Sequence, residues 1–481
     1  MKRPSLLLVV ALVLWYGSVS SFAGAQTTPI DEYIKVEMEK RRIPGLALAV
    51  IQHGAVIKMQ GYGLANVELD VPVTPETVFE LASVTKQFTA TAIMLLVEEG
   101  KVGLDDPIPH YLSNTPDAWQ GITVRHLLTH TAGLASLETG FRALYAGGVR
   151  ANYTTAEMFD AATKDPLSFA PGERWQYSDV GYFLLGMILE KASGQRYRAL
   201  VTERFFQPLG MTASSVLDQW AILKHRASGY TLRDGQLVHI RRNAQVELPS
   251  HYGIFSTVKD LVTWEAALTE GKVVQPSSLD QMWTPVTLND GTTRPYGFGW
   301  GVDERRGHRL ITHSGITGTE YSRFPDDGLT VIVLTNLGIS VGTTGANSWG
   351  LTIGVAGRYM PDLLVSSLQA QPDPHPQTTR QLQDVLSQIA HGEQAPLMTP
   401  GLRTVIASSP NAQSLLATRL NALKAFTFVM CEEVQGRAVE RLRARISQRC
   451  YYKMLTGSET YYYTFWLTPQ GQVADIRSYT E

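Results

Sequence analysis

The 481-residue sequence contains only two cysteines, Cys431 and Cys450, and both lie near its C-terminal end. Basic and acidic residues nearly cancel, for a formal net charge of -2, and no run of lysine or arginine stands out. The sequence therefore lacks the electrostatic footprint of a nucleic-acid-binding protein and has no basic segment to hold it on anionic lipid. Charged residues make up 18% and hydrophobic residues 44% of the chain, which is typical of globular domains rather than disordered ones.

Long apolar runs are also missing, apart from one near the start of the chain. Lys2 and Arg3 precede an apolar run at Leu6–Tyr16, and the small residues that follow end in Ala23–Ala25, the form of a signal-peptidase site. The run is shorter than the ~20 residues that a spanning helix needs. We therefore predict a signal peptide over residues 1–25 and a secreted or periplasmic protein with no stable membrane span after cleavage.

The length and a cluster of prolines predict the domain organisation. The chain exceeds the usual size of one hydrophobic core, which favours more than one domain. Pro372, Pro374 and Pro376 fall within one short polar stretch, which favours an extended linker over a packed element. We therefore predict a large domain over 26–370, a linker over 371–379 and a small α+β accessory domain over 380–481.

Local patterns predict the main elements of the large domain. Two apolar runs flank Gly54 within Gly45–Gly61, which is typical of a hairpin. Ser83–Glu99 is apolar on nearly every face and is followed by a glycine, which predicts a buried helix. The chain from about 121 to 270 is helical in pattern and broken by turns. Alternating runs then predict antiparallel strands at Tyr296–Val302, His308–His313 and Leu329–Asn336.

In the accessory domain a helical stretch precedes four predicted strand regions, at Phe426–Glu433, Val439–Leu455, Tyr461–Leu467 and Val473–Tyr479. These regions are rich in tyrosine. A sugar- or peptide-binding face is one interpretation, but aromatics in adjacent strands more often pack against a helix, so we favour a core. A disulfide between Cys431 and Cys450 stays open, because the sequence does not supply the Cα separation that decides it.

Two Ser-x-x-Lys tetrads are present, Ser83–Lys86 and Ser256–Lys259. A serine three residues before a lysine on a helix places both side chains on one face, so the amine can reach the hydroxyl. The spacing alone does not choose between the tetrads, because a capping serine beside a solvated lysine also fits it. Only Ser83 is followed by Tyr177–Asp179 and then His313–Gly315, so we predict Ser83 as a nucleophile and Ser256 as structural.

Several further segments, in order along the chain, look like those of one enzyme family: Leu81–Thr89, Leu104–Pro107, Val124–Thr131, Pro171–Gly186 and Tyr296–Trp300. On these segments the chain resembles the beta-lactamase-related serine hydrolases, a superfamily that includes penicillin-binding proteins, over about residues 30–360. The resemblance implies an α/β (α+β) fold, with an antiparallel sheet flanked by helices beside a mostly helical lobe and the site in the groove between them. It also implies a small-molecule or peptide acyl substrate and no cofactor.

The resemblance assigns a role to each motif residue. Ser83 is the expected nucleophile, Lys86 is its neighbour in proton transfer, and Tyr177 replaces the tyrosine that shuttles the proton in class C enzymes. The backbone amides of Ser83 and Ile316 are the expected oxyanion hole, in which one donor is worth about 3 kcal/mol. The remaining motif residues are expected to bind substrate: Asp179, His313, Ser314 and Gly315.

Two motif residues depart from the family pattern, which more often has asparagine at Asp179 and lysine at His313. An ionised Asp179 should raise the pKa of Lys86, which favours a Tyr177 phenolate over a neutral lysine as the base. His313 should be mostly neutral at pH 7 and a poor anchor for a substrate carboxylate. We therefore expect hydrolysis of a small ester, a D-amino-acid peptide or a related acyl substrate through an acyl-enzyme. A beta-lactamase or penicillin-binding carboxypeptidase, and a non-catalytic binding or sensing module, are the alternatives.

A metal site is not predicted. His126 and His130 stand four residues apart on an expected helix, a spacing that could bind zinc. No glutamate follows the first histidine as it does in zinc proteases, and the resemblance gives this segment a structural place.

Overall fold

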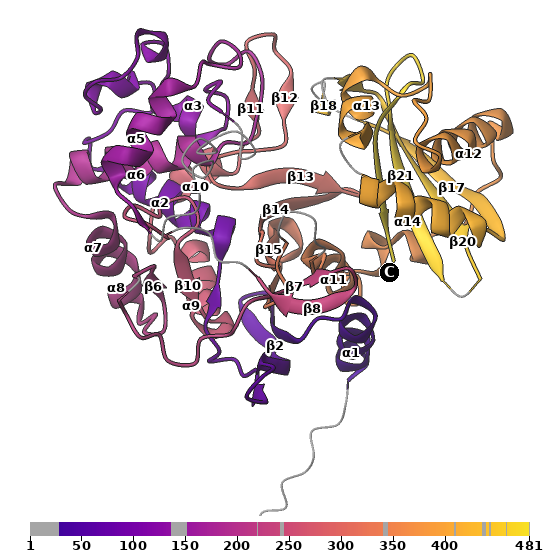
Figure 1. Cartoon of the computed structure of the whole chain (residues 1–481), viewed down its shortest axis with the longest axis horizontal. Helices are drawn as coiled ribbons and strands as arrows, with labels where there is room; N and C mark the ends of the chain where they lie inside the picture. The colour runs from indigo at the N-terminus through magenta and orange to yellow at the C-terminus, as the bar shows by residue number, and fades with distance from the viewer. Residues whose placement is uncertain are drawn as a thin grey trace, which may run out of the picture.

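The computed structural model describes residues 28–135, 152–218, 220–240, 245–339, 345–407, 410–434, 439–441, 444–457 and 459–480. The chain forms two parts that lie side by side, a larger one up to about residue 370 and a smaller C-terminal module (Figure 1). The predicted signal peptide lies outside the described residues. None of the described helices combines the length and the apolar character that a bilayer-spanning segment requires.

Within the described residues, the larger part is built on a seven-stranded antiparallel sheet of order β13-β14-β15-β16-β1-β2-β3. Early and late segments of the chain meet at its centre, where β1 pairs with β16 and Leu48 lies opposite Val333. The strands are β1 (Gly45–Gln52), β2 (Ala55–Asn66), β3 (Val71–Pro72), β13 (Gly301–Arg305), β14 (His308–Gly315), β15 (Thr319–Phe324) and β16 (Leu329–Thr335). The hairpin predicted around Gly54 is confirmed as β1–β2.

Two strand predictions need correction. The strand predicted at Tyr296–Val302 begins only at Gly301, because the chain before it turns through Gly299, which has a φ of 76° that suits glycine. Tyr296 is buried in this turn rather than placed on a strand. The strand β15 was not predicted, since its residues are all buried and show no alternation of polar and apolar side chains.

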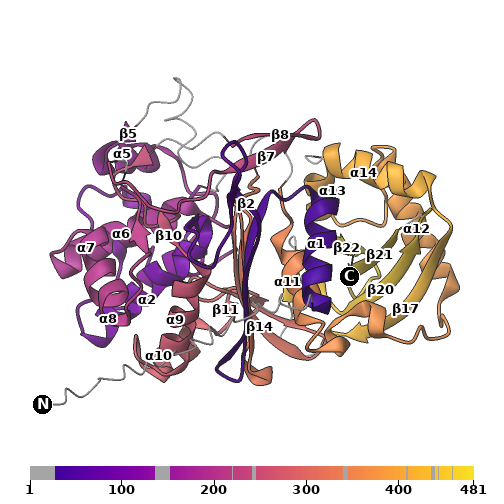
Figure 2. The same cartoon turned by 90° about the horizontal axis from the view of Figure 1, so that it is seen from below.

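Helices cover both faces of the sheet, as Figure 2 shows edge-on. One face packs against the helical lobe through α2 (Thr85–Glu98) and α9 (Val258–Thr269), and the other against α1 (Pro29–Arg41) and α11 (Ser348–Ala356), which face the C-terminal module. Successive residues of β1 serve different cores: Ala47 and Ala49 join the lobe side, whereas Leu48 joins the α1–α11 side. The sheet is therefore a buried middle layer.

The helical lobe is confirmed as predicted, with α2 at its centre. The helix predicted at Ser83–Glu99 begins as a 3-10 turn, η1 (Ala82–Val84), which continues directly into α2. Helix α2 packs against α6 (Asp179–Ser193), and further helices of the lobe are α3 (Val124–Leu128), α5 (Thr155–Lys164), α7 (Tyr197–Val201) and α10 (Pro276–Met282). Short strands also occur within the lobe, which is mostly helical, as predicted.

The C-terminal module has its own core between helices and an antiparallel sheet of order β17-β20-β21-β22. Its elements are α12 (Pro376–Ala390), α13 (Pro400–Ala407), α14 (Pro410–Asn421), β17 (Ala425–Glu433), β20 (Gln448–Leu455), β21 (Thr460–Leu467) and β22 (Val473–Tyr479). Helix α12 starts inside the stretch predicted as a linker, because Pro376 occupies the first helical turn, where its missing N–H costs no hydrogen bond. The region predicted as one strand at Val439–Leu455 is divided into β18 (Val439–Arg441), β19 (Ala444–Ile446) and β20.

Three tyrosines of the module are packed inside it. Tyr452, Tyr461 and Tyr463 are buried in its core, as the core interpretation predicted. Cys431 and Cys450 lie opposite each other on β17 and β20, with Cα atoms 4.1 Å apart, and form a disulfide.

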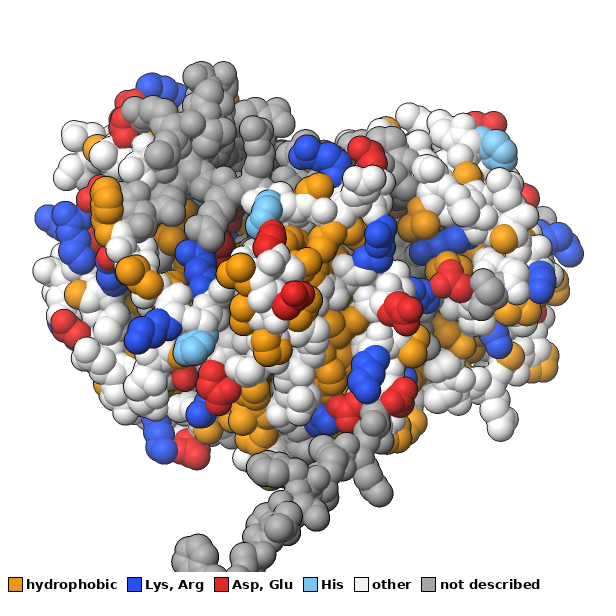
Figure 3. Space-filling view, turned by 60° about the horizontal axis from the view of Figure 1, so that its bottom comes forward, with side chains coloured by type: hydrophobic (Ala, Val, Ile, Leu, Met, Phe, Trp, Pro, Cys, Tyr) orange, Lys and Arg blue, Asp and Glu red, His pale blue; other side chains and the backbone are white. Residues whose placement is uncertain are grey.

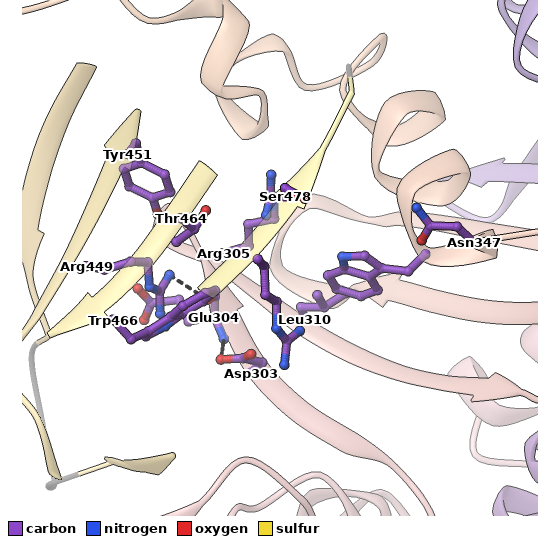
Figure 4. Close-up of a pocket in the computed structure, with 12 residues that line it drawn as sticks. Asp303, Glu304, Arg305, Leu310, Asn347, Arg449, Tyr451, Thr464, Trp466 and Ser478 are labelled. Atoms are coloured by element: carbon purple, nitrogen blue, oxygen red, sulfur yellow. Dashed lines mark hydrogen bonds between the residues drawn. The ribbon is translucent and has the colours of Figure 1, made fainter. Parts of the chain in front are cut away.

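The two parts contact each other between β13 and one face of the module sheet, to which the inner strands β20 and β21 contribute. A guanidinium N–H of Arg449 donates to the carbonyl oxygen of Glu304 at 3.2 Å. A cavity of about 260 Å³ lies at this boundary, and Figure 4 shows Tyr451 and Trp466 of the module facing residues of β13 across it. None of its lining residues belongs to the motifs that contain Ser83, Tyr177 and His313.

On the face shown in Figure 3, basic and acidic side chains are interspersed. This agrees with the small net charge of the sequence.

Candidate active site

Ser83 lies in the η1 turn at the start of α2, in an unusual backbone setting. The residue before it, Ala82, has a φ of 48°, in the left-handed region that non-glycine residues rarely adopt. Strand β14 packs against this turn, and a side chain at Gly315 would collide with the carbonyl oxygen of Leu81. The glycine of the third motif therefore allows β14 to approach the serine closely.

Lys86 is fully buried one helical turn after Ser83, and its amine has three oxygen neighbours. Nζ lies 3.2 Å from Ser83 Oγ, 2.7 Å from Asp179 Oδ1 and 2.8 Å from the carbonyl oxygen of His251. Asp179 is the first residue of α6, where the helix dipole favours a carboxylate. The first and second motifs thus meet at the lysine, as the sequence predicted.

Tyr177 interacts with both Lys86 and Ser83. Its ring centre lies 4.8 Å from Lys86 Nζ, and its hydroxyl hydrogen-bonds to the Ser83 side chain. Ser178 follows it and caps α6, accepting from the amide of Gly181 at 3.4 Å. The cap fixes the chain direction at the start of α6, and this directs Tyr177 toward the serine.

Burial decides the charge balance of the site. It lowers the pKa of the Lys86 amine, and the Asp179 carboxylate opposes that change without cancelling it. Burial acts to raise the pKa of Asp179, but Lys86, His251 and His313 together outweigh it and the pKa is lowered, so the carboxylate is ionised. The sequence predicted a raised pKa for Lys86, and this was wrong because only Asp179, not burial, was considered.

The same burial affects Tyr177. It raises the pKa of the phenol well above its ordinary value, Asp179 adds to the rise, and the hydrogen bond with Ser83 acts the other way. The phenolate form that the sequence favoured is therefore disfavoured.

His313 lies in the site, but its ring nitrogens already have partners. Nδ1 is 2.9 Å from the carbonyl oxygen of Ser314, which can only accept, so Nδ1 carries the proton. Nε2 then accepts from the Tyr296 hydroxyl at 3.0 Å. Burial lowers the pKa of His313 to about 3, so the ring is neutral at pH 7, as predicted. The single N–H of this neutral ring is therefore donated to the Ser314 carbonyl oxygen.

The predicted oxyanion donors lie on facing segments. Ser83 belongs to the η1 turn, and Ile316 directly follows β14, which packs on that turn. The side chain of Ile316 is 45% exposed, so the segment after β14 is open to solvent. The oxyanion role of the two amides stays a prediction, as does the contact of Ser314 with a substrate.

Aromatic residues to which the sequence analysis gave no catalytic role pack against Tyr177. The buried ring of His130 lies 4.3 Å from that of Tyr177 and 4.7 Å from that of Tyr296, between ring centres. His130 Nδ1 accepts from the amide of Ser178 at 3.2 Å, which ties it to the second motif. His130 and Tyr296 both lie in segments that carried the family resemblance, which was the only sequence signal for them.

His126 and His130 do not face a common ligand position. His126 Nδ1 accepts from the amide of Thr123 at 3.1 Å and completes the cap of α3, whereas His130 packs against Tyr177. Across the described residues, histidine, cysteine and acidic side chains form no group of three or more that could hold a metal ion.

The second tetrad is confirmed as structural. Ser256 is fully buried on β10 (Ile254–Ser256), with Oγ 2.8 Å from that of Ser214. Lys259 points to solvent, with 58% of its side chain exposed, and lies 3.5 Å from Glu76. The two side chains of this tetrad therefore do not meet.

Comparison with known proteins adds names to this geometry. A family model described as Beta-lactamase matches residues 30–347. Penicillin-binding protein 4* of Bacillus subtilis (strain 168) is 32% identical over 323 residues, which cover 62% of this chain and 69% of that protein. Protein flp of Staphylococcus aureus (strain N315) is 31% identical over 319 residues, which cover 64% of this chain and only 62% of that protein.

Solved structures share the fold. The octameric penicillin-binding protein homologue from Pyrococcus abyssi has a TM-score of 0.60 at 22% identity and covers 94% of this chain and 98% of its own, so the likeness extends into the C-terminal module. EstCE1, a hydrolase with promiscuous acyltransferase activity, has a TM-score of 0.58 at 23% identity and covers 69% of this chain and 96% of its own. The D-amino acid amidase from Ochrobactrum anthropi SV3 has a TM-score of 0.58 at 24% identity and covers 69% and 100%.

Proposed function

Because the chain belongs to the Beta-lactamase family, we propose that it is a serine hydrolase that cleaves an ester or amide through an acyl-enzyme on Ser83. The observation that carries this proposal is that a buried amine and a phenol both interact with one serine side chain: Lys86 Nζ lies 3.2 Å from Ser83 Oγ, and the Tyr177 phenol hydrogen-bonds to Ser83. A nucleophilic serine needs a group that takes its proton, and both neighbours can exchange protons.

We assign Lys86 as the base and Tyr177 as the acid. A neutral amine has two N–H donors and one lone pair, and Asp179 and the His251 carbonyl accept from two of its three directions. The lone pair then faces Ser83 and can take its proton. Tyr177, which burial keeps protonated, can donate its proton to the leaving group and regain one from Lys86.

Acylation and deacylation of Ser83 follow from these roles. Ser83 Oγ bonds to the substrate carbonyl carbon, the bond to the alcohol or amine breaks, and the leaving group takes a proton from Tyr177. The amides of Ser83 and Ile316 are the proposed donors to the oxyanion, each worth on the order of 3 kcal/mol. Water then attacks the acyl-enzyme, the proton path runs in reverse, and the acid is released.

We infer that uncharged acyl groups are preferred. With a pKa of about 3, His313 offers no positive charge at neutral pH where related enzymes carry a lysine. A small ester or a D-amino-acid amide needs no such charge, whereas penicillins carry a carboxylate. The likeness to a D-amino acid amidase and to a hydrolase with acyltransferase activity supports this preference, and the relatives named as penicillin-binding proteins keep beta-lactam acylation as the second candidate.

We also propose export, from the charged start and apolar run of residues 1–25. Sequencing the N-terminus of protein recovered from the periplasm or medium should begin at Gln26. An intact Met1 on all of the protein would refute this.

The nucleophile is tested by labelling. The protein is incubated with a fluorophosphonate and, separately, with a penicillin, and the peptide that contains Ser83 is measured by mass spectrometry. We expect rapid labelling by the fluorophosphonate and slower labelling by the penicillin. A faster penicillin reaction would favour the second candidate, and an unlabelled peptide with both reagents would favour a binding module instead.

A further inference from the structure

A small sheet joins the C-terminal module to the wall of the candidate active site. Its strands are β11 (Val286–Thr287) and β12 (Thr293–Arg294) of the larger part and β18 and β19 of the module, and Thr293 pairs in parallel with Val439. Figure 1 shows β11 and β12 extending beside the lobe toward β18. A two-stranded hairpin is only marginally stable alone, and β11 and β12 pair at just two positions, so the module is needed to hold it.

The lobe side of this hairpin contacts the segment that carries Tyr177. The amide of Asn289 donates to the carbonyl oxygen of Gly172 at 2.9 Å. The guanidinium carbon of Arg294 lies 5.4 Å from the ring centre of Trp175, a cation–π distance. The ring of Trp175 in turn lies 6.5 Å from that of Tyr177 and 5.8 Å from that of Tyr296.

On the module side, β18 and β19 are held by a disulfide and by packing. The chain leaves β17 for β18 and β19 just after Cys431 and returns just before Cys450, so the disulfide closes the base of this excursion. Above the disulfide the amide of Val434 donates to the carbonyl oxygen of Ser447 at 2.9 Å, and Ile446 packs in a cluster with Trp466. Arg445 of β19 attracts Asp290, which lies in the turn between β11 and β12.

We propose that Arg294 is a positioning residue through which the C-terminal module orients Trp175 and Tyr177 for proton donation to the leaving group. This inference rests on the proposed function of Tyr177. Catalytic groups must be held within a fraction of an ångström of their working position, and a planar guanidinium anchored on a paired strand restricts the indole beside it.

The test uses leaving groups that differ in their need for a proton. Nitrophenolate leaves without one, whereas the amine of an anilide must be protonated. In the full chain, Arg294→Gln should lower kcat for the anilide about tenfold and for the nitrophenyl ester about twofold or less, with KM nearly unchanged. Arg294→Lys, which keeps a cation, should restore part of the anilide rate. The control is Arg358→Gln, which removes a guanidinium 3.5 Å from the Tyr33 ring on the opposite face of the sheet.

The role of the module is tested by Arg445→Glu. Arg445 is exposed, and the variant places a second negative charge close to Asp290 in the hairpin turn. Like Arg294→Gln, it should lower the ratio of kcat for the anilide to kcat for the ester. Combined with Arg294→Gln it should have no further effect, because both substitutions act through the same contacts. Arg380→Glu, the same charge change on exposed α12, should leave the ratio unchanged.

Equal losses for both substrates, or additive effects of the two variants, would overturn the inference. So would a normal ratio in Arg294→Gln. If Ser83→Ala keeps full activity, the proposed function fails instead, whereas an inactive Ser83→Ala beside a normal Arg294→Gln removes only this inference.

Discussion

The two Ser-x-x-Lys tetrads have the same spacing but different surroundings. Around Ser83 the lysine is fully buried and shares its amine between the serine, a carboxylate and a backbone carbonyl. Around Ser256 the lysine is largely solvated, and the serine hydroxyl is occupied by another serine. Burial lowers the pKa of Lys86, and the Asp179 carboxylate opposes this without cancelling it. The chemistry therefore comes from burial and from side chains contributed by other elements, not from the tetrad itself.

The largest difference is expected between the two serines. Ser83→Ala removes the nucleophile and should reduce hydrolysis of a nitrophenyl ester by at least about 10³-fold. Ser256→Ala removes one buried hydrogen bond and should leave kcat near the wild-type value. Steady-state rates of the two folded variants check this, and the reverse order of activities would show that the nucleophile was chosen wrongly.

The two lysines should differ next. Lys86→Ala should slow acylation by about 10²- to 10⁴-fold, the usual contribution of a general base, while Lys259→Ala should have little effect. Tyr177→Phe should slow an anilide by about 10²-fold and a nitrophenyl ester much less, because only the anilide needs the proton. Single-turnover acylation rates measure these effects. Equal losses for both substrates in Tyr177→Phe would make the tyrosine the base.

The burial that separates the tetrads should also appear in the acid stability of the fold. Burial lowers the pKa of His251 to about 4 and that of His313 to about 3. Below about pH 6.5 these two histidines are protonated in the unfolded chain but not in the folded one. The free energy of unfolding therefore falls as the pH drops toward 4, by about 1.4 kcal/mol per pH unit for each histidine.

His251→Gln should therefore make that slope shallower by about 1.4 kcal/mol per pH unit between pH 6 and 4.5. Urea unfolding at several pH values measures the slope. His391→Gln, at the exposed end of α12, is the control and should leave the slope as it is. An unchanged slope in His251→Gln would mean that His251 is protonated in the fold.

The smallest effect on Ser83 labelling is expected from removing the module, because none of its described residues contacts either tetrad. The larger part has its own cores on both faces of the sheet, so a chain that ends at Ala370 should fold and should keep Ser83 labelling within about tenfold of the full chain. Labelling rates and circular dichroism of the shortened chain check this. Insoluble protein would mean that the boundary along β13 is required for folding.

The sequence predicted what depends on neighbouring residues and failed where distant segments meet. The β1–β2 hairpin, helix α2 and most strands of the module follow from local alternation and turn residues. The order of the three motifs is the basis on which Ser83 was predicted as the nucleophile. The net pKa change of Lys86 was not predictable, because it depends on how α6 and the His251 segment close over the amine. The pairing of Thr293 with Val439 joins the larger part to the C-terminal module and leaves no local pattern.

The η1 turn and helix α2 together carry Ser83 and Lys86, the proposed nucleophile and base, and α2 is buried along most of its length. A substitution along it would therefore change packing and catalysis at once, and cores tolerate changes of volume poorly. For directed evolution toward new substrates, this helix should be kept constant. Diversity belongs instead in the exposed side chain of Ile316, which follows the strand β14 that packs on the serine turn and can vary without disturbing the core.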